Sequence, residues 1–308
     1  MSEYDRNSTP TASLPPPAHP DAGAQARFLW LPVTEIRPYD RNPRRADNPE
    51  ADRIQASIRA GGMDQPLVVT QRPGDSHVMV QAGGNTRLRI VQALFAQTGD
   101  PRFEHVPCLF QPWRRESDVL LAHLKENDLH GPLSFIDKAL AVAEAKRLFE
   151  AELGEGALSQ RRLEELLKTR GYSLSHGLIS RMAYAVEPLL PAMPQALQAG
   201  LGRPQVERLR ALDRAACTLW QHHGLGDETT FGEVFAQLCR RYDGPDWDIE
   251  PLRGALETEL AEHAETSIDT VRAQFAARLS GQETWILPGE AAPEAGPQAA
   301  VPAVRANP

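Results

Sequence analysis

The residue types best suited to chemistry lie in the segment Ala82–Arg89, which reads Ala-Gly-Gly-Asn-Thr-Arg-Leu-Arg. Glycines between a strand and a helix let the backbone approach an anion closely, and the free N–H groups at a helix N-terminus favour phosphate. The guanidinium groups of Arg87 and Arg89 add charge-assisted donors. The pattern therefore indicates phosphate binding by Gly83 and Gly84, with a plain tight turn carrying two surface arginines as the alternative.

Two further segments stand out beside this turn. Gly62-Met63-Asp64-Gln65-Pro66 forms a turn after an expected helix, and Leu124–Asp128 ends another helix. In the second segment, Glu126 and Asn127 offer the hard oxygens that Mg²⁺ takes when it is bound together with phosphates. Taken alone, each segment is typical of an ordinary loop or a solvated helix end.

A third group of residues is placed to read DNA. Within residues 158–184, Ser159 can cap one short helix, Gly171 marks a turn, and a second helix opens near Ser175. This is typical of a helix-turn-helix, although a plain helical hairpin fits the pattern as well. The apolar residues expected inside are Leu163, Leu166, Leu167, Leu178, Ile179 and Met182. The polar residues expected on the exposed face of the second helix are Ser175, His176, Gly177, Ser180 and Arg181.

The elements that must position these residues alternate between strand and helix in the first part of the chain. Strands are expected at 28–33, 67–70, 77–81 and 106–110, and helices at 51–60 and from Gly84 to Leu94. After Leu133 no β-rich run recurs, and Ile136, Ala139, Leu140, Ala143 and Leu148 follow a helical period. The predicted fold class is an α+β N-terminal domain followed by an all-α helix-turn-helix domain and further helices.

Changes in composition divide the chain into five parts. Residues 1–23 are rich in Pro, Ser and Ala and are expected to form a disordered arm, as is the tail at 288–308. Between them we predict an α+β domain at 24–133 and a helical domain with the helix-turn-helix at 134–212. In the helical region at 213–287, Leu252, Leu256, Leu260 and Ile268 follow a helical period that fits a core helix better than a dimer-forming one.

Charge and cysteine content limit the class of protein. The 308 residues have a net charge of −8, but residues 213–308 alone contribute −9, so the preceding part is weakly basic and compatible with DNA. The three cysteines show no metal spacing and are expected as reduced thiols. No apolar run approaches a membrane span, and no secretory signal is visible, so a cytoplasmic protein without membrane contact is expected.

In their order and spacing these motifs resemble the ParB family of partition proteins. Asn42-Pro43-Arg44 is similar to the family's opening box, Gly62–Pro66 to its G-x-x-QP loop, Gly84–Ile90 to its GERRxRA box, and Glu126–Ala139 to its ENxQR box. The resemblance covers residues 28–212, and the overall pattern is closest to the ParB-like proteins of integrating conjugative elements.

The resemblance implies a ParB/sulfiredoxin-like N-terminal domain that binds cytidine triphosphate (CTP) with Mg²⁺ and closes a dimeric clamp around DNA. By position, the nucleotide-binding residues would be Gly62, Gln65, Gly83, Gly84, Thr86, Arg87 and Arg89, with Glu126 and Asn127 near the metal. Asn85 and Thr86 replace the box's Glu and first Arg, and Leu129-His130 replaces its Gln-x-Arg, so binding is expected to survive better than hydrolysis. Asn85 also stands where sulfiredoxin needs a cysteine, which excludes that chemistry.

The function expected is sequence-specific binding of double-stranded DNA in chromosome or plasmid partition, or in the maintenance of a mobile element. The expected partners are a ParA-type ATPase and a second copy of the chain, at the nucleoid. A weak CTPase activity stays open. The alternatives are a helix-turn-helix transcriptional regulator without a nucleotide switch and a ParB-like nuclease, although the sequence does not gather the acidic residues of a two-metal site.

Overall fold

A computed structural model describes residues 26–280 of the chain. The contacts divide the chain into two compact units, Met1–Val206 and Glu207–Pro308. The arm expected at 1–23 and the tail expected at 288–308 lie outside the described residues. None of the described helices is long and apolar enough to span a membrane.

The first unit is built on a five-stranded mixed sheet in the order β1-β5-β3-β4-β2. Its strands are β1 (Arg27–Pro32), β2 (Ile36–Arg37), β3 (Leu67–Thr70), β4 (Val78–Ala82) and β5 (His105–Phe110). The pairs β1–β5 and β3–β4 are antiparallel, whereas β3–β5 and β2–β4 are parallel. The hairpin expected between β3 and β4 is confirmed.

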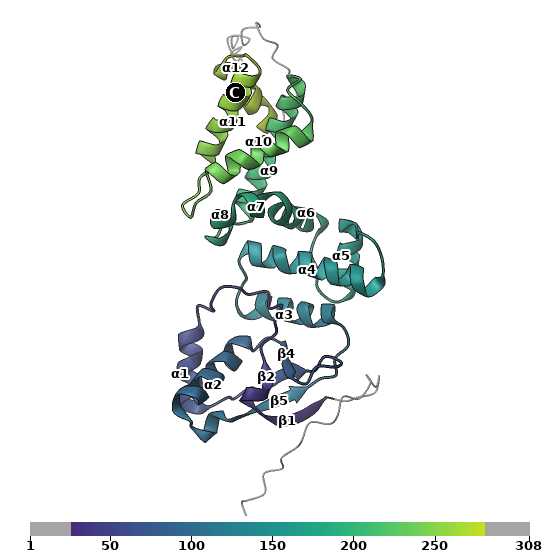
Figure 1. Ribbon diagram of the computed structural model, residues 1–308, viewed down its shortest axis with the longest axis vertical. Coiled ribbons are helices and arrows are strands. Elements are labelled where there is room, and N and C mark those ends of the chain that lie inside the picture. The colour runs from purple at the N-terminus through teal and green to yellow at the C-terminus, as the bar shows by residue number, and fades with distance from the viewer. Residues whose placement is uncertain (1–25, 281–308) are drawn as a thin grey trace, which may run out of the picture. The chain divides into compact units, whose positions relative to one another are not determined.

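Helices α1 (Ala51–Gly61) and α2 (Asn85–Thr98) belong to the same layer of the first unit (Figure 1). The hydrophobic core combines alternate residues of the strands with one side of each helix, because side chains of a strand point in turn to opposite faces. The core includes Leu31, Ile58, Leu67, Val69, Val78, Val80, Leu88, Val91, Val106 and Cys108. Short 3-10 segments at Val33–Glu35 and Pro101–Phe103 close the connections.

The rest of the first unit is helical, in agreement with the change of pattern after Leu133. The helices are α3 (Glu116–His130), α4 (Phe135–Leu153), α5 (Gln160–Thr169), α6 (His176–Tyr184), α7 (Leu190–Ala192) and α8 (Pro194–Gln198), with a π-helical turn at Ala185–Leu189. Serine side chains cap three of them, as Ser134, Ser159 and Ser175 accept hydrogen bonds from N–H groups of the first turn. Helix α9 (Arg203–His222) crosses the division between the units.

The second unit contains helices α10 (Glu228–Arg241), α11 (Ile249–His263) and α12 (Ile268–Leu279). Leu252, Leu256 and Leu260 are buried along α11, as expected of a core helix. Ile268, which we assigned to the same stripe, is half-buried and opens α12 instead. The intervening residues 264–267 end the first helix, so the period does not continue through them.

The face of α4 differs from the expected one. Ile136 and Ala139 are buried as predicted, but Leu140, Ala143 and Leu148 are only half-buried. The buried positions that continue the face are Ala141, Val142, Ala145 and Phe149. Apolar residues lie on every side of this helix, so their period alone does not define which side packs.

In α6, Leu178 is half-buried and differs from the prediction, whereas Ile179 and Met182 are buried as expected.

Candidate nucleotide site and DNA-binding helices

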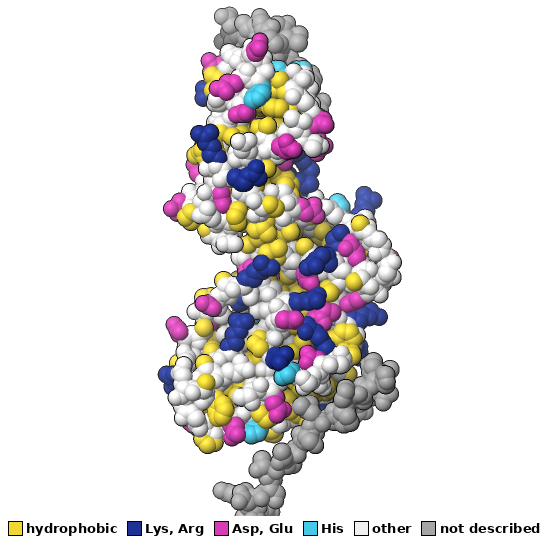
Figure 2. All heavy atoms as spheres, viewed as in Figure 1, with side chains coloured by type: hydrophobic (Ala, Val, Ile, Leu, Met, Phe, Trp, Pro, Cys, Tyr) yellow, Lys and Arg dark blue, Asp and Glu magenta, His cyan; other side chains and the backbone are white. Residues whose placement is uncertain are grey.

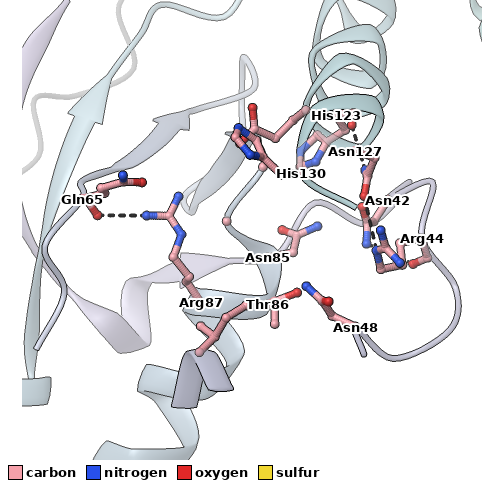
Figure 3. A pocket seen from close by; sticks show the side chains of 14 residues that line it. Asn42, Arg44, Asn48, Gln65, Asn85, Thr86, Arg87, His123, Asn127 and His130 are labelled. Carbon is pink, nitrogen blue, oxygen red and sulfur yellow. Dashed lines mark hydrogen bonds and ion pairs between the residues drawn. The ribbon is translucent and has the colours of Figure 1, made fainter. Parts of the chain in front are cut away.

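A cleft of about 300 Å³ gathers most of the residues that the motifs singled out. The loop after β2, helix α1, the turn between β4 and α2, and helix α3 all contribute to it (Figure 3). It is lined by Asn42, Arg44, Asn48, Ile54, Gln65, Gly83, Gly84, Asn85, Thr86, Arg87, His123, Glu126, Asn127 and His130. Segments distant in sequence thus meet at the N-terminus of α2.

The turn into α2 requires glycine at two successive positions. Gly83 and Gly84 adopt φ values of +55° and +80°, in the left-handed region that other residues rarely occupy. A Cβ atom on Gly83 would lie 2.5 Å from Cγ of Glu126, and one on Gly84 would lie 2.8 Å from Cδ2 of Leu67. The glycines therefore let Glu126 pack directly over the backbone at the opening of α2.

Asn85, the first residue of α2, is held by one half of its amide only. Its Oδ1 accepts a hydrogen bond of 3.0 Å from the backbone N–H of Tyr39. Its Nδ2 is buried and has no hydrogen-bond partner within the described residues. An unpaired buried donor costs about 1–3 kcal/mol. Asn85 thus brings an unused donor to the wall of the cleft, beside the N–H groups of the helix terminus.

Arg87 and Glu126 set the charge of the cleft. Burial lowers the pKa of the Arg87 guanidinium, and the negative charge of Glu126 partly offsets this effect. Nη1 of Arg87 donates a 3.1 Å hydrogen bond to the backbone oxygen of Gln65. On the other side, Nε2 of His130 lies 3.7 Å from Oε1 of Glu126. A cation, a carboxylate and an imidazole therefore face one small volume, which suits a phosphate group bound with a metal ion.

The opposite wall is a hydrogen-bonded chain that ends in a buried histidine. Arg44 donates from Nε to Oδ1 of Asn127 at 3.3 Å and from Nη2 to the backbone oxygen of Gly131. Asn127 in turn donates from Nδ2 to the backbone oxygen of His123 at 2.8 Å. The His123 ring stacks on Tyr39 with the centroids 4.7 Å apart. Both ends of the Asn127 amide are thus engaged by protein groups.

Two residues assigned by the motifs do not line the cleft. Gly62 follows α1 as its C-cap, and Arg89 is exposed on α2, two residues beyond Arg87. Gln65, Thr86 and the remaining nucleotide and metal candidates do line it. The lining residues that we did not assign to the nucleotide or the metal are Asn42, Arg44, Asn48, Ile54, Asn85, His123 and His130. Figure 3 shows Asn48 and Thr86 pointing toward one another across the cleft.

Helices α5 and α6 are consecutive short helices joined by residues 170–175. Gly171 adopts φ +73° in this turn, and Oγ of Ser175 accepts a hydrogen bond of 3.3 Å from the Leu178 N–H. Ser175, His176 and Gly177 are exposed at the start of α6, as expected. Ser180 and Arg181 were also expected on the exposed face but are half-buried, because they lie between the buried positions Ile179 and Met182. In Figure 2, Lys and Arg side chains over α4 and α5 are interspersed with Asp and Glu side chains. Several of them form ion pairs, such as Lys146 with Glu150 and Arg162 with Glu165.

Helix α3 joins the cleft to the turn before α6. Nζ of Lys125 donates a 2.7 Å hydrogen bond to the backbone oxygen of Arg170. The Tyr172 hydroxyl donates to Oδ2 of Asp128 at 3.0 Å. Glu126 lies between these two contacts in sequence and faces the cleft. A displacement of this end of α3 would therefore reach the turn that sets the position of α6.

No protein-family model matches the sequence, and no curated protein matches it. Among solved structures, the chain is similar to the C-terminally truncated ParB of Caulobacter crescentus complexed with CTP-gamma-S, at 20% identity and a TM-score of 0.28 over 60% of this chain and 92% of that one. It is also similar to a pNOB8-like ParB N-domain, at 12% identity and a TM-score of 0.45 over 84% and 97%. The same Caulobacter crescentus protein complexed to its centromeric parS site shows 15% identity and a TM-score of 0.33 over 80% and 98%.

Proposed function

We propose that this chain is a ParB-like protein that binds a specific DNA duplex through α6 and a nucleoside triphosphate, CTP, in the cleft at α2. The observation that carries the nucleotide part is the unpaired Nδ2 of Asn85 at a helix N-terminus, beside the Gly83-Gly84 turn and the guanidinium of Arg87. Helix N-termini with close backbone approach and fixed donors are general phosphate sites. A polyphosphate would satisfy the donor and neutralise the cation together.

The cleft fits Mg²⁺ as a partner of the nucleotide, with Glu126 as its protein ligand. Mg²⁺ commonly takes one or two carboxylates and completes its shell with phosphate oxygens and water. Asn127 was assigned to the same ion, but its oxygen already accepts from Arg44. We therefore assign Asn127 to the orientation of Arg44. Within residues 26–280 no group of three His, Cys, Asp or Glu side chains is placed to hold a metal, so no observation supports a two-metal nuclease.

Slow hydrolysis, or none, follows from the side chains in the cleft. Asn85 stands where the resemblance implies a carboxylate, and its oxygen is already bound to the Tyr39 backbone. His130 stands where the resemblance implies an arginine. These substitutions remove charges that would act on the transition state, whereas the groups that bind the ground state remain. The contacts of Lys125 and Asp128 then give nucleotide occupancy a route to α6, as required of a nucleotide-gated clamp.

Isothermal titration of the full chain with CTP and Mg²⁺, with and without duplex DNA, tests the nucleotide part. We expect heat of binding at or below millimolar CTP, weaker heat with the other nucleoside triphosphates, and little or no release of phosphate. The absence of heat at millimolar CTP under both conditions would favour a transcriptional regulator that binds DNA through α6 without a nucleotide switch.

Replacing Arg181 by alanine is expected to weaken specific duplex binding by about 1–3 kcal/mol if the guanidinium contacts a base edge. If it contacts a phosphate instead, affinity for all duplexes should fall alike, and the salt dependence of log K should decrease by about one. The site is first selected from a random duplex pool and then measured by anisotropy. Arg59, exposed on α1, provides the matched control. Unchanged affinity and salt dependence would remove α6 from the interface.

The same proposal includes the biological role of the chain and its partners. The resemblance of the motifs supports a role in partition or maintenance of a mobile element of the integrating conjugative kind, with a ParA-type ATPase and a second copy of the chain as partners. A clamp needs two copies to enclose DNA. Light scattering of the chain with CTP tests whether two copies associate. Retention on circular but not on linear duplex tests whether the clamp closes, because a closed clamp is retained on circular DNA and slides off open ends.

A further inference from the structure

An aromatic pair lies exposed on the edge strand of the sheet, away from both the cleft and α6. Phe28 and Trp30 of β1 are 74% and 67% exposed. They alternate with Leu29 and Leu31, which face the core, so both rings lie on the same outer face of the strand. Residues two apart on a strand are separated by about 6.8 Å. The two rings thus form an exposed aromatic surface on the outer face of the edge strand, which we call the platform.

The outer face continues from the platform onto the neighbouring strand. Trp30 pairs in register with Pro107, and Phe28 pairs with Leu109. Both partners are half-buried. Strand β1 pairs only with β5, so its other edge is unpaired within the part of the chain that the structure describes. Large exposed aromatic side chains in such a position indicate a binding surface rather than a packing remnant.

Positive charge is concentrated at one end of this platform. A cleft of about 440 Å³ is lined by Ala26, which precedes β1, and by Arg114 and Arg115, which precede α3. Both arginines are exposed, and neither forms an ion pair with another residue of the described range. The acidic side chain of the cleft, Asp118, is already neutralised by Arg170 at 2.9 Å. The cleft is therefore cationic.

Further groups in and around this cleft favour nucleic acid over an apolar protein partner. The amide oxygen of Gln81 lines it, is buried, and has no hydrogen-bond partner among the described residues. Glu104 lies beyond the opposite end of β1, since its backbone oxygen accepts from Val33. The phosphate backbone would thus enter at the arginine end.

We propose that the outer face of β1, with Phe28 and Trp30, and the adjoining cleft of Arg114 and Arg115 form a binding site for single-stranded nucleic acid. Two unstacked bases lie on the two rings, and the phosphates between and beside them meet the arginines. Aromatic platforms combined with a basic groove bind single strands with little sequence preference, because every base has a π-face. A duplex keeps its bases stacked on each other and cannot use the platform.

The test is fluorescence anisotropy of a labelled oligothymidylate of about 20 nucleotides with the full chain. Changing Phe28 and Trp30 together to alanine should weaken binding about tenfold or more. Trp30→Phe should keep most of the affinity, whereas Trp30→Leu, which keeps the apolar surface but not the stacking, should lose it. Changing Arg114 and Arg115 to alanine should lower the salt dependence of log K by about 1.4. Arg59→Ala is the matched charge control.

Two controls separate this site from α6 and from protein docking. The double aromatic variant should bind the selected duplex as the wild type does, because α6 does not include these residues, and its thermal midpoint should be unchanged since both rings are exposed. Equal affinity of this variant and the wild type for the oligothymidylate would overturn the proposal. Self-association of the wild type that the double variant lacks, with oligothymidylate affinity unaltered, would identify the surface as an interface between copies instead.

Discussion

Replacing Arg87 by alanine is expected to abolish nucleoside triphosphate binding in the titration range where the wild type saturates. The guanidinium is half-buried in the cleft and close enough to Glu126 for its pKa to feel that charge. Hydrogen bonds to charged groups contribute about 1.5–3 kcal/mol each, so the loss should be at least about tenfold. Isothermal titration with CTP and Mg²⁺ measures it, and binding of short duplexes by α6 should persist.

Arg89 provides the matched control for this variant. It has the same charge, lies two residues further along α2, and is exposed outside the cleft. Arg89→Ala should therefore leave CTP affinity within about twofold, and Arg87→Lys should be intermediate because it keeps the charge but loses the planar donor pair. Equal losses in the Arg87 and Arg89 variants would mean that general charge, and not the cleft, attracts the nucleotide.

The contrast between Arg87 and Arg89 shows what the sequence could and could not predict about the site. The strand-to-helix turn was predictable, because two successive glycines before a helical period require the positive φ values that Gly83 and Gly84 adopt. Once α2 begins at Asn85, positions two apart on a helix point to different sides, so one box cannot place both arginines in one cleft. The start of a helix is known to a residue only from the structure.

Other contributions to the cleft carry no periodic signal at all. Arg44 and Asn48 lie in the irregular segment between β2 and α1, where only tertiary contacts decide which side chains turn inward. His123 carries no signal in the sequence, since a lone histidine between Ala122 and Leu124 has no sequence neighbour that marks it as buried. By contrast, β1, β3, β4, β5 and the α5–α6 pair were predictable, because β-rich runs and the positions of turn and cap residues act locally on the backbone. The short strand β2 and the strand order depend on tertiary contacts and were not predicted.

Lowering the pH from 6.5 to 4 is expected to destabilise the first unit through His123 by up to about 3 kcal/mol. The side chain is buried, and burial lowers its pKa from 6.5 to about 4, with a smaller opposing effect from the Val80 carbonyl. The unfolded chain therefore takes up a proton before the folded one does. The contribution is fully present above pH 6.5 and is lost as the pH falls toward the folded pKa.

The measurement is urea unfolding of the full chain at several pH values for the wild type and for His123→Gln. Glutamine can keep the donor to the Val80 backbone oxygen, 3.3 Å from Nε2 in the native protein, but does not titrate. The difference between the two proteins isolates His123, because every carboxylate is common to both. That difference in the free energy of unfolding should be constant above pH 6.5 and should change by up to about 3 kcal/mol in favour of the variant between pH 6.5 and 4.

His176→Gln, at an exposed position on α6, is the control, and its free energy of unfolding should follow that of the wild type throughout. A constant difference across the whole range would contradict the prediction. It would show that the folded protein takes up a proton on His123, in its stacked position against Tyr39, as readily as the unfolded chain does.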